Sequence, residues 1–302
     1  MKLEKLKLDL NVEWKISRNS TNFKENYILS HKEHQSEVAP NIRYGETPEH
    51  IEKSFSDFLN NPKVLENGEF PRSLKNAILN LELKSTGDIY QILSLKRIES
   101  IKTSFSIPIM ESKNLKDYLK ERMDFKVYKC KIANTNELSL LKTLASLVDV
   151  PIRVDANEGF QSLEDYLHFQ SEIKGLNIEF IEQPFPAARK DLYLQLKRKS
   201  LFPIFADESV EDDFNGDEFQ KMFDGINIKL MKAGGIERSK QLLEKARKYH
   251  LKTMLGCMIE TSLGIREAMY LAELVDYFDL DGHLFLKECR LDGMSKYLLY
   301  VR

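Results

Sequence analysis

FKVYKCKIA, at residues 125–133, is the first of five short apolar segments that each carry a charged side chain at the end. Neighbouring segments are separated by enough residues for one helix. Alternating strands and helices predict a parallel sheet. Packing alone does not require a charged residue at the end of each strand, so this repeated ending indicates a site that several strands share. The other four segments are PIRVDANEG (151–159), IEFIEQPF (178–185), PIFADES (203–209) and GINIKLMKAGG (225–235).

Eight strand-like segments follow residue 100, with amphipathic helical segments between them. Eight such units predict a closed α/β barrel of the TIM type, and a flat doubly wound sheet is the competing interpretation. The flat sheet is disfavoured because no GxGxxG follows the first strand and because polar residues end most of the strands. The predicted strands cover residues 103–109, 126–132, 151–156, 177–183, 203–208, 225–230, 252–257 and 277–281.

The first 95 or so residues have a different pattern. Residues 1–16 and 26–33 alternate apolar and polar side chains with a period of two, which is typical of antiparallel strands. The polar stretch between them, residues 17–25, is expected to form an exposed loop. Two helical patterns follow, and Thr47 before Pro48 predicts where the first of them begins. This part of the chain therefore predicts a small α+β domain.

Bulk properties exclude several classes of function. The formal net charge of the 302 residues is -2, which predicts neither a nucleic-acid surface nor a membrane surface. No apolar stretch approaches the roughly 18 residues of a transmembrane helix, and the N-terminus has no apolar core of a signal peptide. Cys130, Cys257 and Cys289 are widely spaced and form no disulfide framework. We therefore expect a cytoplasmic protein without nucleic-acid or membrane partners.

Asp155, Glu182 and Asp207 end three successive predicted strands, and all strand ends of a barrel open onto one face. A single Asp at a strand end is more often a helix cap or a loop residue. Three carboxylates in one place repel each other unless a cation lies between them. A hard divalent ion with oxygen ligands fits, with Mg²⁺ as the first choice and Mn²⁺ as the alternative.

Lys131 and Lys229 end the second and sixth predicted strands and should flank this metal site. A lysine acts as a base near neutral pH only when its pKa is lowered, and Lys129, on the same strand face as Lys131, supplies a like charge. Lys129 is also placed to reach a substrate carboxylate. The alternative is a half-exposed strand whose lysines extend to solvent. Two lysines around a metal-bound carboxylate predict racemisation or epimerisation, whereas one basic lysine would allow elimination of a leaving group.

The segments KCK, VDAN, EQP, ADES and NIKLMKAGG resemble the enolase superfamily, in its muconate-lactonizing-enzyme-like branch. The resemblance implies a modified (β/α)₇β barrel at residues 98–283. It also implies an α+β capping domain at residues 1–97, to which residues 284–302 are a candidate addition. The chain ends at LDGMSKYLLYVR, before the Pro-Gly-Leu-Gly-like stretch of family members, so a trimmed cap is expected.

MLGCMIETSLG, at residues 254–264, and the FDLD segment that ends at Asp281 resemble the dipeptide epimerases of this branch. The resemblance implies that Asp279 and Asp281 bind the α-ammonium group of the substrate, with a pair of loop or cap aspartates as the structural alternative. It implies substrate contacts for Arg18, through an acidic side chain, and for Ser106, through its hydroxyl, and a supporting or purely structural role for Glu260.

The resemblance as a whole implies a Mg²⁺-dependent isomerase that epimerises dipeptides such as L-Ala-D/L-Glu in cell-wall peptide metabolism and that can form homo-oligomers. The alternatives within the branch are N-acylamino-acid racemase, o-succinylbenzoate synthase and muconate cycloisomerase. The paired aspartates disfavour them because their substrates carry no free ammonium. A barrel that only binds a ligand is a further alternative, but such a barrel is expected to lack a metal ligand or a lysine, and none is missing.

Overall fold

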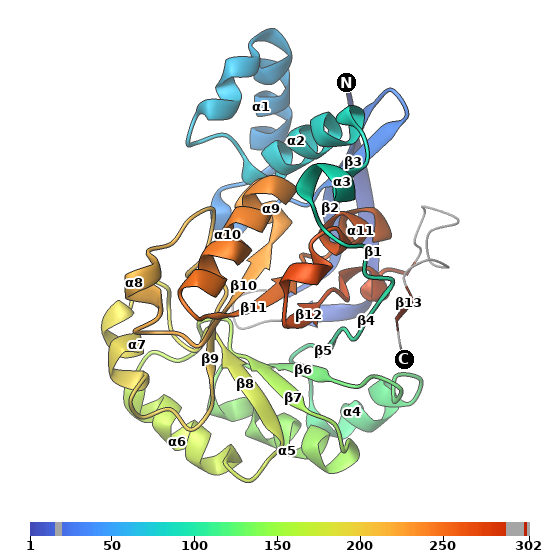
Figure 1. The fold of residues 1–302 in the computed structure, drawn as a ribbon. Helices are drawn as coiled ribbons and strands as arrows, with labels where there is room; N and C mark the ends of the chain where they lie inside the picture. The colour runs from blue at the N-terminus through green and yellow to red at the C-terminus, as the bar shows by residue number, and fades with distance from the viewer. Residues whose placement is uncertain (16–19, 288–298, 301–302) are drawn as a thin grey trace.

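Eight parallel strands, β5 to β12, form the central sheet of the computed structural model, which describes residues 1–15, 20–287 and 299–300 (Figure 1). Neighbours in the sheet are neighbours in the chain, and an isolated parallel bridge from Thr103 to Phe278 closes it into a barrel. All eight predicted strands are confirmed, each over a shorter range than predicted. They are β5 (Phe105–Ile107), β6 (Tyr128–Lys131), β7 (Ile152–Asp155), β8 (Ile178–Glu182), β9 (Ile204–Ala206), β10 (Gly225–Lys229), β11 (Lys252–Gly256) and β12 (Tyr277–Asp279).

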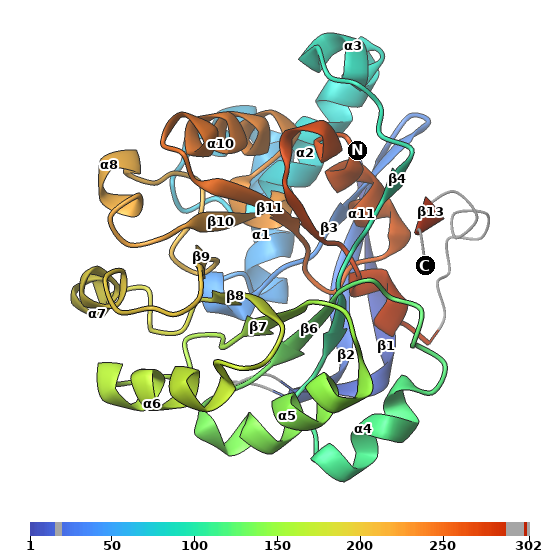
Figure 2. The ribbon, with the colours of Figure 1, turned by 60° about the horizontal axis from the view of Figure 1, so that its bottom comes forward.

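Helices connect consecutive strands and lie around the outside of the barrel (Figure 2). Each of the seven connections contains at least one α-helix, and none follows β12 among the described residues. The (β/α)₇β barrel is therefore confirmed, and the flat doubly wound sheet is excluded. The helices are α4 (Ser112–Leu119), α5 (Leu138–Leu147), α6 (Leu163–Ile173), α7 (Lys190–Leu196), α8 (Gly216–Phe219), α9 (Leu230–Ala233), α10 (Ile236–Lys248) and α11 (Ser262–Met269).

The N-terminal part consists of an antiparallel sheet of three strands and a set of helices with its own apolar core. The predicted start of the first helix is confirmed, because the Thr47 hydroxyl accepts a hydrogen bond from the His50 N–H at 3.2 Å. The elements are β1 (Lys2–Lys15), β2 (Ser20–His31), β3 (His34–Val38), α1 (Pro48–Asn60), α2 (Arg72–Thr86), α3 (Ile89–Leu93) and β4 (Ser100–Ile101), which pairs with β13 (Leu299–Tyr300).

The expected loop at residues 17–25 is wrong over most of its length, because β2 already begins at Ser20. Thr21 pairs with Trp14 across the hairpin, after a register shift that begins at Asp9. The polar composition of this segment does not prevent strand formation, because β1 supplies a partner for its backbone hydrogen bonds.

The N-terminal sheet rests directly on the barrel (Figure 1). Leu10 of β1 bridges to Leu286, and the Lys287 N–H donates to the Asp9 carbonyl at 2.9 Å. The Asn11 side chain donates to the Leu284 carbonyl at 3.0 Å. These contacts join β1 to the segment after β12 and bring the end of β1 to the barrel mouth. The division of the chain at residue 97 stays a prediction.

No helix in the described part of the chain combines the length and the apolar character that crossing a membrane requires.

Candidate active site

The parallel register places the charged strand ends of β6, β7 and β8 level with one another. Lys131 lies opposite Asp155, and Asp155 lies opposite Glu182. Because residues in register on neighbouring strands project to the same side of the sheet, these three side chains share one level of the barrel interior. The Lys131 ammonium donates to the Asp155 carboxylate at 2.8 Å.

A second row forms on the other wall of the barrel, where Lys229 lies opposite Gly256 and Gly256 opposite Asp279. Gly256 is required here because a Cβ atom would lie 2.4 Å from the side-chain oxygen of Asn227. The Asn227 amide uses that space to donate to Glu182 at 2.9 Å. Asn227 was not predicted, although its position two residues before Lys229 places it on the same strand face.

Lys129 lies at the centre of the carboxylates. Its side chain is 1% exposed, and its ammonium lies 3.1 Å from Asp155, 2.8 Å from Glu182 and 2.6 Å from Asp279. Burial acts to lower the pKa of Lys129, but the charges of the surrounding carboxylates outweigh burial and hold the pKa well above its usual value. Burial likewise acts to raise the pKa of Asp155, and the two lysine ammonium groups hold it below its usual range.

Asp207 has two lysine partners. Lys229 donates to its carboxylate at 2.7 Å, and Lys232 contacts the same carboxylate and donates to the Asp207 carbonyl at 2.6 Å. Burial acts to lower the pKa of Lys229, but the Asp207 charge raises it above its usual value, opposite to the lowered pKa expected of a base. A divalent cation bound by Asp207 would offset this charge and act to lower the pKa of Lys229. Lys232 is 2% exposed and was not predicted as part of the site. Lys232 follows Lys229 by three residues, and the strand ends between them. Neither strand nor helix periodicity therefore predicts that both lysines contact the same carboxylate.

The three predicted metal ligands fit a divalent cation by chemistry, although within residues 1–15, 20–287 and 299–300 no three acidic, His or Cys side chains are already arranged as a metal centre. Glu182 is fully buried, and its Oε2 atom is near Lys129 but accepts no hydrogen bond. Burial, together with the charges of Asp155 and Asp207, raises the pKa of Glu182 to about 7. A bound cation would add positive charge beside this buried carboxyl group and favour its ionised form.

Asp279 and Asp281 lie together at the end of β12, as predicted. Asp279 accepts a hydrogen bond from the Ser104 hydroxyl at 2.7 Å, and Asp281 accepts one from the Ser106 N–H at 2.6 Å. Burial raises the pKa of Asp281 to about 7, and the charge of Asp279 contributes to the increase. Ser106 thus contacts Asp281 through both its backbone N–H and its hydroxyl. A contact of its hydroxyl with substrate stays a prediction.

A cavity of about 580 Å³ opens above these side chains. Asp155 and Glu182, fully buried, lie outside its lining. The predicted residues that line it are Lys129, Lys131, Asp207, Lys229, Ser106, Asp279 and Asp281. The N-terminal part contributes further residues that the sequence did not indicate, among them Trp14, Lys24, Arg43 and Tyr44.

Two further predicted residues are Arg18 and Glu260. Arg18 lies outside the described residues. Glu260 is buried and accepts a hydrogen bond from the Met258 N–H at 2.7 Å, so it holds a loop of which Met258 and Ile259 line the cavity. Burial and the nearby Glu37 charge hold the pKa of Glu260 well above its usual value.

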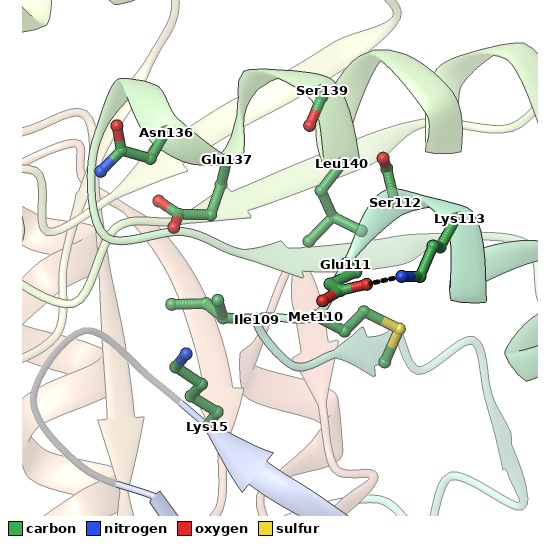
Figure 3. Close-up of a pocket in the computed structure, with 10 residues that line it drawn as sticks. All are labelled: Lys15, Ile109, Met110, Glu111, Ser112, Lys113, Asn136, Glu137, Ser139 and Leu140. Atoms are coloured by element: carbon green, nitrogen blue, oxygen red, sulfur yellow. Dashed lines mark ion pairs between the residues drawn. The ribbon is translucent and has the colours of Figure 1, made fainter.

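A second hollow, of about 420 Å³, lies beside α4 and the start of α5 (Figure 3). Its acidic side chains already have partners. Glu111 pairs with Lys113 at 2.5 Å, and Glu137 accepts the N–H groups of Ala133 and Asn134 at 3.0 Å. None of the predicted site residues lines it, so we assign the site to the larger cavity.

Residues 112–285 match the enolase C-terminal domain-like family. The chain belongs to this family. The resemblance of its strand-end segments is thereby confirmed. This enolase-family chain is also similar to an L-Ala-D/L-amino acid epimerase from Pedosphaera parvula, with 35% identity over 269 residues that cover 82% of this chain and 77% of that protein.

A second relative is the L-Ala-D/L-amino acid epimerase of Flavobacterium johnsoniae, with 31% identity over 68% of this chain. The match spans 61% of the length of that protein. Among solved structures, the dipeptide epimerase of Methylococcus capsulatus, complexed with Mg and the dipeptide L-Arg-D-Lys, superposes with a TM-score of 0.81. It is 25% identical, and the superposition covers 95% of this chain and 91% of that chain.

Proposed function

We propose that this enolase-family chain is an isomerase, a Mg²⁺-dependent dipeptide epimerase that inverts the α-carbon of the C-terminal residue. The observation that carries the proposal is the position of Lys131 on β6 and of Lys229 on β10, four strands apart in a barrel of eight. They therefore lie on opposite walls of one cavity, which is where two bases must be placed to act on the two faces of one carbon.

Two lysines exchange the proton, and three carboxylates would hold the metal. In one direction Lys131 removes the α-proton and Lys229 donates a proton to the opposite face, and in the other direction the roles are exchanged. Asp155, Glu182 and Asp207 would hold the metal. A divalent cation bound there would bind the substrate carboxylate and stabilise the charge that develops when the α-proton leaves. Mn²⁺ is an alternative to Mg²⁺ with the same oxygen ligands.

Asp279 and Asp281 favour a dipeptide over an N-acylated amino acid. No ion pair of Asp281 occurs among the described residues, and burial, together with the charge of Asp279, raises its pKa to about 7. The α-ammonium group of a dipeptide would supply a positive charge beside Asp281, whereas an N-acyl group would not. The relatives that act on dipeptides support the same choice. We propose that Lys129 and Ser106 contact the substrate and that Glu260 supports the cavity loop.

Exchange in deuterium oxide tests the reaction. With Mg²⁺ and L-Ala-L-Glu, we expect deuterium at the Glu α-carbon together with formation of L-Ala-D-Glu, both measured by ¹H NMR. Treatment with EDTA should stop both and added Mg²⁺ should restore them. N-acetylglutamate and o-succinylbenzoate precursors, as substrates of the alternative activities, serve as controls. The absence of exchange with every member of a dipeptide library would contradict the proposal.

Replacement of Lys229 tests the two-base mechanism. In Lys229→Ala, inversion should fall by about 10³-fold or more, because one face has no proton donor, while exchange of one epimer through Lys131 continues. Circular dichroism checks that the barrel is folded. Wild-type inversion in this variant would show that one base suffices.

The cytoplasmic location, assembly into homo-oligomers and a role in cell-wall peptide metabolism stay predictions from the sequence.

A further inference from the structure

We propose that Trp14, supplied by the N-terminal sheet, is a positioning residue for Lys131 and acts on only one face of the substrate. The inference rests on the proposed function, because it assumes that Lys131 exchanges the α-proton. It adds a residue outside the barrel to a proton transfer that the barrel strands otherwise provide. It also predicts that substitution of Trp14 affects proton exchange by Lys131 but not by Lys229. Two equivalent bases would not show this difference.

Lys131 has two kinds of contact. Its ammonium donates a hydrogen bond to the Asp155 carboxylate at 2.8 Å. The same ammonium lies 5.6 Å from the centre of the Trp14 ring. This is within the distance at which an indole face attracts a cation. Both residues line the cavity, so the indole and the ammonium are exposed to the same substrate. The ring therefore limits where the Lys131 ammonium can move.

The barrel holds the indole in place. The Trp14 ring packs on Phe285 with ring centres 4.4 Å apart, and Phe285 in turn packs on Phe105 of β5 at 5.3 Å. Phe285 is 1% exposed, so it is a fixed support. The next residue in the chain, Lys15, accepts a hydrogen bond from the Ile109 N–H at 3.0 Å. The end of β1 is thus attached to the barrel both by ring packing and through the backbone.

Lys229 has no such cover. In the described part of the chain, no aromatic ring lies over its ammonium at cation–π distance, and its contacts are the Asp207 carboxylate and the neighbouring charges. Lysine side chains have several rotatable bonds, so placing the nitrogen at the α-carbon costs conformational entropy. A ring that restricts Lys131 reduces this cost on one face only. The consequence is a face-specific effect of Trp14.

Variants with a single lysine separate the two faces. In Lys229→Ala only Lys131 exchanges the α-proton, and in Lys131→Ala only Lys229 does. Adding Trp14→Leu should slow deuterium exchange about tenfold in the first background and less than about twofold in the second. Trp14→Phe keeps an aromatic face and should restore most of the exchange in the first background. Equal losses in both backgrounds would overturn the proposal, because they would show a general packing role.

Fluorescence tests the contact without any turnover. Trp14 is the only tryptophan of the chain, so the emission spectrum reports its surroundings alone. Without substrate, Lys131→Met should change the intensity or the wavelength of maximum emission, and Lys229→Met should leave both as in the wild type. Identical spectra for the two variants would overturn the proposal. A wild-type protein that exchanges no dipeptide proton would contradict the proposed function, whereas this measurement would still decide the contact.

Discussion

Asp281 and Asp279 differ in their environments although they lie two residues apart. Asp279 pairs with Lys129 and accepts a hydrogen bond from Ser104, and its pKa is lowered, since these contacts outweigh its burial. Asp281 accepts hydrogen bonds from the N–H and the hydroxyl of Ser106, but burial and the charge of Asp279 outweigh them and raise its pKa to about 7. At the scale of single residues, the site therefore contains one carboxylate whose charge is balanced and one that needs a cation.

This difference predicts how dipeptide binding depends on pH. Below about pH 7 Asp281 becomes neutral and no longer attracts the substrate ammonium, so affinity should fall by up to about tenfold per pH unit. Isothermal titration calorimetry between about pH 8 and pH 6 measures this. Asp281→Asn should bind weakly with little pH dependence over the same range. Equal pH dependence in both proteins would assign the effect to another group.

The contribution of Asp281 to stability changes with pH in the opposite direction to its contribution to dipeptide affinity. The folded pKa of Asp281 lies above that of the unfolded chain, so the ligand-free folded state binds more protons between about pH 4 and pH 7. The contribution of Asp281 to the free energy of unfolding is therefore largest at low pH and is lost as the pH rises through 7.

At the scale of elements, the site depends on close contact between the loops that follow β6 and β7. Gly159, after β7, approaches the backbone of Ala133, after β6, so closely that an added Cβ atom would lie 1.7 Å from the Ala133 carbonyl oxygen. Asp155 and Lys131 lie at the ends of these strands. Gly159 therefore helps to set the distance between these two side chains, although it takes no part in the proposed reaction.

Gly159→Ala should lower the free energy of unfolding by about 3 kcal/mol, because backbone atoms must move to admit the methyl group. Urea unfolding followed by circular dichroism measures the change. Gly175→Ala is the matched control, since nothing lies within 4 Å of an added Cβ atom there. Similar unfolding midpoints for the two variants would show that the loops can separate freely.

At the scale of the whole molecule, one buried carboxylate joins the N-terminal sheet to the barrel. Glu37 of β3 is fully buried and accepts hydrogen bonds from the N–H and hydroxyl groups of Thr261, from the Gly264 N–H and from the Asn26 side chain. Thr261 is the N-cap of α11, and Gly264 lies in the first turn of this helix. The N-terminal sheet therefore supplies the negative charge at the start of a barrel helix.

Glu37→Gln should lower the free energy of unfolding by about 3 kcal/mol, because an amide NH₂ group would face donors in a buried place. Thermal unfolding measures the loss. Glu33→Gln is the control, since the Glu33 side chain is 75% exposed. If both variants unfold at the same temperature, the Glu37 carboxylate does not help to hold the two parts of the chain together.

The sequence by itself determined the eight strands of the barrel and the charged residues at their ends. Both are local properties: apolar runs mark buried strands, and a lysine or carboxylate that ends such a run is visible without a structure. Local patterns did not place the start of β2, because the segment 17–25 is polar and its residues from Ser20 onward form a strand only through pairing with β1.

Only the tertiary structure decided which charges meet. Lys129 and Asp279 are 150 residues apart, and their contact at 2.6 Å exists because the barrel closes. The same closure, with β1 docked at the barrel mouth, places Trp14 over Lys131 and Glu37 beneath α11. Contacts of this kind depend on register and on the packing of distant elements, and no pattern of neighbouring residues contains that information.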